Sequence, residues 1–181
     1  MDAITALHTR TAAPRLEEPA PGDAALDQIL RAGLRAPDHQ MLRPWRFLVV
    51  EGQARYKLGQ LFVDALQPQT PEATTKLQSS PLRAPLIIIA VATVKEHPKV
   101  PAIEQVESCA AAVQNMSLAI HALGFGSIWK TGAVAYDPRV KLALGLKETD
   151  AIVGYLYVGT PTTRERQVPL LKMADFVVYW K

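Results

Sequence analysis

Three short stretches of the sequence place cationic side chains beside apolar or aromatic ones. They are Arg10-Thr11-Ala12 with Arg15 beyond it, Arg35-Ala36-Pro37-Asp38-His39 running on to Arg43-Pro44-Trp45, and Trp129-Lys130-Thr131-Gly132. Each has a purely structural alternative, since an arginine near a helix C-terminus complements the helix dipole and a Pro-Trp pair can form a turn and a core anchor. Together they favour binding of an anionic, flat, redox-active ring. Guanidinium groups hold phosphate, aromatic side chains cover the ring, and a cation stabilises the charge gained on reduction.

The other reactive residue types form no recognisable metal or nucleophile motif. No Cys, Asp or Glu stands at metal-ligand spacing from the histidines, and the HExxH, GxSxG and P-loop patterns do not occur. The lone Cys109 lies among alanines, where a small hydrophobic residue is expected. Gly124-Phe125-Gly126 follows a helix and precedes a strand, the reverse of a dinucleotide-binding loop. We therefore expect Gly124 to cap a helix and Gly126 to mark the close approach of another backbone or a ligand.

The length, composition and charge of the chain exclude several classes of protein. The 181 residues predict a single domain, residues 1–181, with 49% hydrophobic and 20% charged residues. The net charge of +3 is spread over both halves of the chain, so no basic block for nucleic acid is present. The longest uncharged apolar run, Pro85 to Val94, is too short for a membrane helix, and no signal peptide is apparent. We expect a soluble, cytoplasmic protein that binds neither nucleic acid nor membrane.

The elements that must position these residues alternate between helices and strands. Helical spacing predicts helices over Asp2–Arg10, from Asp23 as the cap to Pro37, over Gln53–Leu66, from Glu72, and from Asp137 to Leu144. Strands are predicted over Arg46–Val50, Leu86–Val94, Phe125–Thr131 and Ile152–Val158. The uniformly apolar strand starting at Leu86 should be buried on both faces. A long helix over Ala102–Leu123 should lie centrally, with Val106, Ala110, Val113, Ser117 and Ile120 as one stripe. This order predicts an α+β fold.

Four segments, taken in order, make the chain resemble the FMN-dependent nitroreductase family, most closely its compact bacterial members. They are LRAGLRAPDHQMLRPWRFLVVEG (30–52), LRAPLIIIAVA (82–92), HPKVPAIEQVESCAAAVQNMSLAIHALGFGSIWKTGA (97–133) and IVGYLYVGTP (152–161). The resemblance implies a sandwich with a mostly antiparallel sheet, flanking helices and a long central helix. It also implies a homodimer with FMN at the subunit interface. The apolar run from Phe176 to Trp180 would then be a strand exchanged between the subunits.

The resemblance also assigns roles to individual residues. Arg10 matches a phosphate-binding arginine, followed by Thr11 and Ala12, while Arg35 and His39 match positions that reach the FMN of the other subunit. Trp129, Lys130 and Thr131 match the stretch beside the flavin. A weaker match gives a nicotinamide-contacting region of Ala119, Ile120, His121, Ala122, Leu123 and Gly124. No catalytic side chain and no metal are implied, because the chemistry occurs at flavin N5.

Two departures from the family pattern concern the phosphate site and the turn before the first strand. Arg10-Thr11-Ala12 replaces the usual Arg-Arg-Ser, so phosphate binding must depend on backbone N–H groups, Thr11 and other cations such as Arg35. Arg43 replaces the usual glutamine before Pro-Trp, where it either changes substrate preference or faces solvent.

Two functions follow from the resemblance. In the first, the protein is an NAD(P)H-dependent oxidoreductase that reduces nitroaromatics, quinones or similar electron-poor small molecules in ping-pong order. In the second, it is a non-catalytic flavin-binding, sensor or interaction dimer derived from the same fold, as the weakened phosphate motif would allow.

Overall fold

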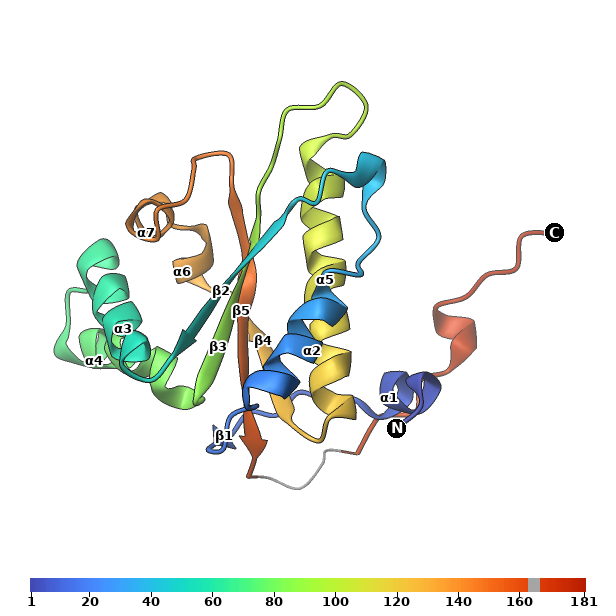
Figure 1. The fold of residues 1–181 in the computed structure, drawn as a ribbon, viewed down its shortest axis with the longest axis horizontal. Helices are drawn as coiled ribbons and strands as arrows, with labels where there is room; N and C mark the ends of the chain where they lie inside the picture. The colour runs from blue at the N-terminus through green and yellow to red at the C-terminus, as the bar shows by residue number, and fades with distance from the viewer. Residues whose placement is uncertain (163–166) are drawn as a thin grey trace.

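The computed structural model describes residues 1–162 and 167–181 (Figure 1). Its helices are α1 (Ala3–Thr9), α2 (Asp23–Gly33), α3 (Gln53–Leu66), α4 (Pro71–Ser79), α5 (Ala102–Ala122), α6 (Ala133–Tyr136) and α7 (Pro138–Ala143). Short 3₁₀ turns lie at η1 (His39–Met41), η2 (Ser80–Arg83) and η3 (Met173–Asp175). The strands are β1 (Leu16–Glu17), β2 (Trp45–Glu51), β3 (Leu86–Ala92), β4 (Gly126–Lys130) and β5 (Ala151–Pro161).

The described strands form one five-stranded antiparallel sheet in the order β1-β5-β3-β2, with β4 also beside β5. Ile88 of β3 lies opposite Val49 of β2 on one side and opposite Leu156 of β5 on the other. Trp129 of β4 also lies opposite Leu156. The long β5 therefore holds three of the other strands in place. The predicted α+β fold with a mostly antiparallel sheet is confirmed.

Helices cover both faces of the sheet, and β3 supplies side chains to both layers (Figure 1). Ile87, Ile89 and Val91 pack with residues of α3, α6 and α7. Their neighbours Leu86, Ile88 and Ala90 pack with α2 and α5. Since successive side chains of a strand point to opposite faces, a strand between two helical layers must be apolar at every position. All seven residues of β3 are buried, as the sequence predicted.

The long helix α5 packs along α2 and runs the length of the sheet (Figure 1). It ends one residue before the predicted Leu123, and Gly124 follows with a φ of +85°, as expected for a glycine after a helix end. The predicted stripe is only partly right. Val113, Ser117 and Ile120 are buried, whereas Val106 and Ala110 are half-buried and Gln105, Cys109, Ala112 and Met116 are buried instead.

The structure differs from the sequence expectations in some further details. Asp23 is the first residue of α2, and the cap position is Gly22, without a side-chain hydrogen bond. The four-residue α6 and the two-residue β1 were not predicted. Within the single chain the run Phe176–Trp180 forms no strand and is part of an exposed arm that extends from the body (Figure 1), so its exchange with a second subunit stays a prediction. A strand needs a neighbouring strand to pair with, and within the described chain this run has none.

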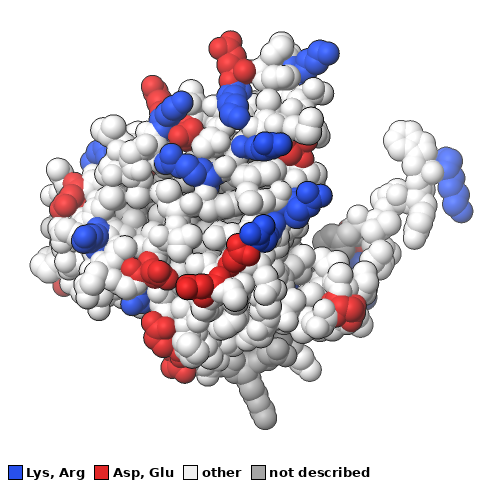
Figure 2. All heavy atoms as spheres, in the orientation of Figure 1, with Lys and Arg blue, Asp and Glu red and all other residues white. Residues whose placement is uncertain are grey.

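The face in Figure 2 shows positive and negative side chains interspersed over the body of the molecule. No helix among the described residues is both long and apolar enough to span a bilayer.

Candidate functional site

The segment after α1 lies against the start of β4. Arg10 caps α1 by donating its backbone N–H to the Ala6 carbonyl at 3.1 Å. Three residues later, the Ala13 N–H donates to the Ser127 carbonyl at 2.9 Å. A Cβ added to Gly126 would lie 2.8 Å from Ala13 Cβ and 2.9 Å from Leu16 Cδ2. The close approach that the sequence predicted at Gly126 is therefore confirmed, and the approaching segment is the one that carries Arg10.

Between these two bonds the segment exposes hydrogen-bond donors. Within residues 1–162 and 167–181, neither the Thr11 nor the Ala12 backbone N–H meets an acceptor. Over the same residues no carboxylate lies within ion-pair distance of the half-buried Arg10. A guanidinium followed by two consecutive free N–H groups is a donor set suited to an anion with several oxygens, such as a phosphate.

A hydrogen bond joins this segment to the end of α5. The Thr9 hydroxyl lies 2.7 Å from the Thr5 carbonyl oxygen. Thr9 Oγ1 also lies 2.8 Å from His121 Nε2, and the tautomer of the imidazole decides which of the two donates. This contact connects the segment that carries Arg10 to the predicted nicotinamide region.

Arg35 also lies near α1 and the end of α5. It lines a largely apolar hollow of about 480 Å³ between α1, α2 and α5, together with Ala6, Ala119 and Ala122. Arg35 has no carboxylate partner in the described part of the chain. The structure therefore brings Arg35 together with part of the predicted nicotinamide region.

His39 is not brought to this group of residues. Its Nδ1 lies 2.6 Å from a carboxylate oxygen of Glu104 in the first turn of α5. A carboxylate can only accept, so Nδ1 is the donor. Seventeen residues of α5 separate Glu104 from His121, a rise of about 25 Å along the helix. In a single chain, His39 and the Arg10 segment lie at opposite ends of α5.

Trp129 and Lys130 point to opposite faces of β4, as alternation along a strand predicts. The Trp129 indole donates to the Val153 carbonyl at 3.2 Å and lies over Gly154, where a Cβ would be 2.1 Å from Nε1. The Lys130 ammonium lies 5.4 Å from the centre of the Tyr157 ring. Burial, with a further contribution from the charge of Arg83, lowers the pKa of Lys130. Thr131 follows at the exposed end of the strand.

Other residues singled out in the sequence take structural positions. Trp45 packs against the α2–α5 core, as expected of an anchor. Arg43 is exposed, has a φ of +49°, and donates its N–H to the Asp38 carboxylate at 2.7 Å. Cys109 is fully buried, and burial raises the pKa of its thiol to about 12, so it is not a thiolate at neutral pH.

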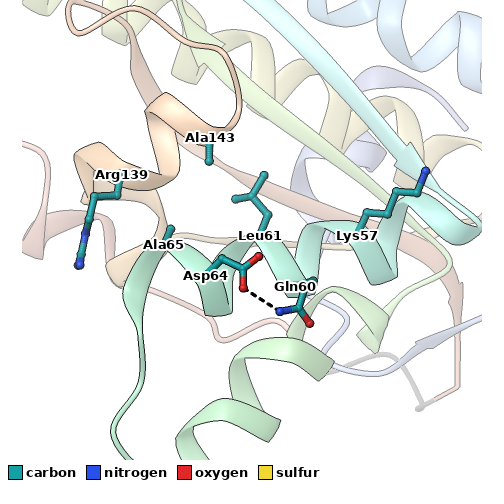
Figure 3. Close-up of a pocket in the computed structure, with 7 residues that line it drawn as sticks. All are labelled: Lys57, Gln60, Leu61, Asp64, Ala65, Arg139 and Ala143. Carbon is teal, nitrogen blue, oxygen red and sulfur yellow. Dashed lines mark hydrogen bonds between the residues drawn. The ribbon is translucent and has the colours of Figure 1, made fainter.

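A separate hollow of about 440 Å³ lies between α3 and α7 (Figure 3). Leu61 points toward Ala143 across it, while Lys57 and Arg139 point away. Gln60 donates to the Asp64 carboxylate at 2.8 Å, and Arg139 pairs with Asp137. Gln60, Asp64 and Arg139 have partners within the described chain and Lys57 points away from the hollow, so we assign it no chemistry. No group of three or more metal-ligating side chains occurs in the residues that the structure describes.

Comparison with known proteins identifies relatives over most of the chain. Residues 16–160 match the sequence model of the Nitroreductase family. The chain is 45% identical over 183 residues to "Putative NAD(P)H nitroreductase YdjA" of Escherichia coli strain K12, covering 99% of this chain and 100% of that protein.

Two solved structures share the fold. A nitroreductase-like family protein from Bacillus cereus has a TM-score of 0.87 at 20% identity, covering 100% of this chain and 97% of that one. A protein from Desulfovibrio desulfuricans, described as a putative nitroreductase in complex with FMN, has a TM-score of 0.78 at 22% identity, covering 100% and 98%. With the family match and the 45% identical relative, these findings show that the chain belongs to the nitroreductase family.

Proposed function

We propose that the protein is an FMN-dependent oxidoreductase that uses NAD(P)H to reduce nitroaromatics, quinones or similar electron-poor small molecules. Bound FMN would supply the redox chemistry, taking a hydride from NAD(P)H and passing two electrons to the acceptor. For a nitro compound, NAD(P)H, one proton and ArNO₂ give NAD(P)⁺, ArNO and water. The family membership and the printed name of the 45% identical relative support this activity.

The observation that carries the proposal is the donor set at Arg10. Its guanidinium, together with the Thr11 and Ala12 N–H groups that meet no acceptor in the described part of the chain, is suited to the FMN phosphate. They lie near the start of β4, since Ala13 is bonded to Ser127 there, while Trp129 and Lys130 form the end of the same strand and Thr131 follows it. This separation suits a cofactor whose phosphate and ring are joined by a ribityl chain. The residues present therefore fit FMN.

Each group has a distinct task under this proposal. Arg10 and Arg35 supply positive charge to phosphate groups, and the Thr11 and Ala12 N–H groups orient the phosphate oxygens. The Trp129–Thr131 stretch borders the ring, and the residues from Ala119 to Gly124 contact the nicotinamide nucleotide. The acceptor takes the place of the nicotinamide after it leaves, which gives ping-pong order.

The active unit that we propose is a homodimer with FMN at the subunit interface. His39 lies about 25 Å along α5 from the contact that holds the Arg10 segment, so a second copy supplies His39 to the site. Large apolar side chains of the terminal arm are also exposed, including Phe176 at 70%, Tyr179 at 79% and Trp180 at 99%. A partner surface would cover this arm and add it to its own sheet edge.

The experiment that tests the proposed function is anaerobic reduction of the purified protein. Flavin-loaded protein should be yellow, should lose its 450 nm band when NADPH or NADH is added, and should regain it when a nitroaromatic or quinone follows. Protein that takes up no added FMN, or whose flavin band persists in excess NAD(P)H, would contradict the proposal and favour a non-catalytic role.

A further inference from the structure

The segment between α2 and β2, which carries His39, is held against α5 by side chains of that helix (Figure 1). Ser108 donates its hydroxyl to the Pro37 carbonyl at 2.6 Å, and the Glu104 carboxylate accepts from His39 Nδ1 at the same distance. Glu104 and Ser108 are four residues apart, so they lie on one face of α5. Two bonds to a single helix face therefore hold the backbone of the segment and the imidazole that it carries.

The turn η1 within this segment has an unusual backbone that further contacts hold in place. Gln40 and Met41 have φ values of +59° and +51°, which residues other than glycine seldom adopt. Lys95 donates its ammonium to the carbonyl of Leu42, the residue directly after the turn, at 2.5 Å. Residues persist in such conformations only where their surroundings hold them, and they are concentrated at ligand contacts. The turn therefore has the character of a segment that presents a side chain.

The His39 imidazole is fixed in direction but is not covered. Its side chain is 67% exposed and that of Glu104 is 34% exposed, and a pair so open to solvent adds little to the stability of the fold. The pair does determine which ring nitrogen is available. Nδ1 donates to Glu104, so Nε2 of the neutral imidazole carries a lone pair and is an acceptor. This Nε2 meets no hydrogen-bond partner among residues 1–162 and 167–181.

We propose that Glu104 is a positioning residue that presents Nε2 of His39 to the FMN bound by a second copy of the chain. The inference rests on the proposed function, in which His39 lies about 25 Å along α5 from the contact that holds the Arg10 segment of its own chain. FMN has an N–H donor on its ring and O–H donors on its ribityl chain, and Nε2 accepts from one of these donors.

Glu104 has this effect through His39 alone, because it contacts the imidazole and not the ligand. Without the carboxylate the proton is no longer held on Nδ1 and moves to Nε2 in part of the molecules, where it removes the acceptor. The exposed ring is also free to rotate away from the direction that the hydrogen bond imposes. Loss of Glu104 should therefore weaken FMN binding about as much as loss of His39 does.

A double-mutant cycle in FMN affinity tests whether Glu104 acts through His39. FMN titrations of the flavin-free chain compare His39→Ala, Glu104→Ala and the double variant. Loss of one neutral hydrogen bond should raise the FMN dissociation constant of His39→Ala about 3- to 10-fold. Glu104→Ala should show a similar loss, and the double variant should bind no more weakly than His39→Ala alone. Glu107→Ala is the matched control, because Glu107 is exposed on the same helix and its loss changes the net charge equally.

A second measurement does not depend on bound FMN. Nitrogen NMR of the full chain with isotope-labelled histidines reports which ring nitrogen carries the proton, and the signal absent from His39→Ala identifies His39. At a pH where the imidazole is neutral, His39 should be protonated on Nδ1 in the wild type and in Glu107→Ala. In Glu104→Ala a substantial fraction should carry the proton on Nε2 instead. Melting temperatures should stay near that of the wild type, because the pair is exposed.

The outcomes separate the role of Glu104 from the proposed function. Wild-type protein that takes up no FMN overturns both. Where the protein binds FMN and NAD(P)H bleaches it, three results overturn the role of Glu104 alone. They are an FMN affinity near that of the wild type in either single variant, losses that multiply in the double variant, and a wild-type His39 whose proton lies on Nε2.

Discussion

Arg10→Ala tests the phosphate site most directly. The side chain is half-buried without a carboxylate partner in the described chain, and its capping bond to Ala6 uses the backbone, which alanine keeps. The substitution should therefore leave α1 in place and remove only the guanidinium. Losing a charge-assisted hydrogen bond costs about 1.5–3 kcal/mol, so the FMN dissociation constant should rise about 10- to 150-fold. Arg35→Ala should act in the same direction.

The assay is titration of flavin-free protein with FMN and with riboflavin, followed by quenching of flavin fluorescence at fixed salt. Riboflavin lacks the phosphate, so Arg10→Ala should leave its dissociation constant within about twofold while weakening FMN binding. Arg46→Ala is the matched control, because Arg46 is exposed on β2, has no assigned role in binding, and changes the net charge equally. Equal losses for FMN and riboflavin, or an FMN affinity unchanged from wild type, would refute the assignment of Arg10 to the phosphate.

Three further predictions concern the surroundings of the site. Gly126→Ala should lower the melting temperature and weaken FMN binding, because the added Cβ would meet Ala13 and Leu16 at 2.8–2.9 Å. Such overpacking costs about 1–3 kcal/mol, and a wild-type melting curve would contradict this prediction. Deleting residues 176–181 should convert the proposed dimer into monomer or aggregate in sedimentation velocity, whereas a soluble dimer of unchanged stability would argue against arm exchange. Lys130→Met should lower the flavin midpoint potential by ~20 mV for each kcal/mol of lost stabilisation, and an unchanged potential would assign that role to backbone donors.

The main elements could be predicted because their side-chain patterns are long and unambiguous. The run Leu86–Ala92 is apolar at all seven positions and rich in isoleucine, which is typical of a strand covered on both faces. Helix α3 was predicted with the correct ends, Gln53 and Leu66. The two missed elements are too short to show a period. α6 has four residues and is fixed by the bond from the Tyr155 hydroxyl to the Val134 carbonyl, a contact between residues 21 apart. β1 exists because Leu16 lies opposite Pro161.

The candidate site was predictable only in part, because it too depends on contacts between residues far apart in the sequence. Gly126 carried a usable signal, since a glycine at the start of a strand indicates that something comes close. Nothing in the sequence indicated that the approaching group would be Ala13, or that His39 would pair with Glu104, 65 residues away.

The position of the Thr11 and Ala12 backbone explains how these residues can replace the arginine and serine of the family pattern. Where the family pattern has a second arginine and a serine, two backbone N–H groups meet no acceptor among the described residues, and every residue except proline supplies such a group. Side-chain identity at these two positions can therefore change while the donors remain. Their direction depends instead on the Ala13–Ser127 bond and on the space left by Gly126. Apart from Arg10, the strongest sequence constraints on the proposed phosphate site should lie at residues that position the segment without touching the phosphate.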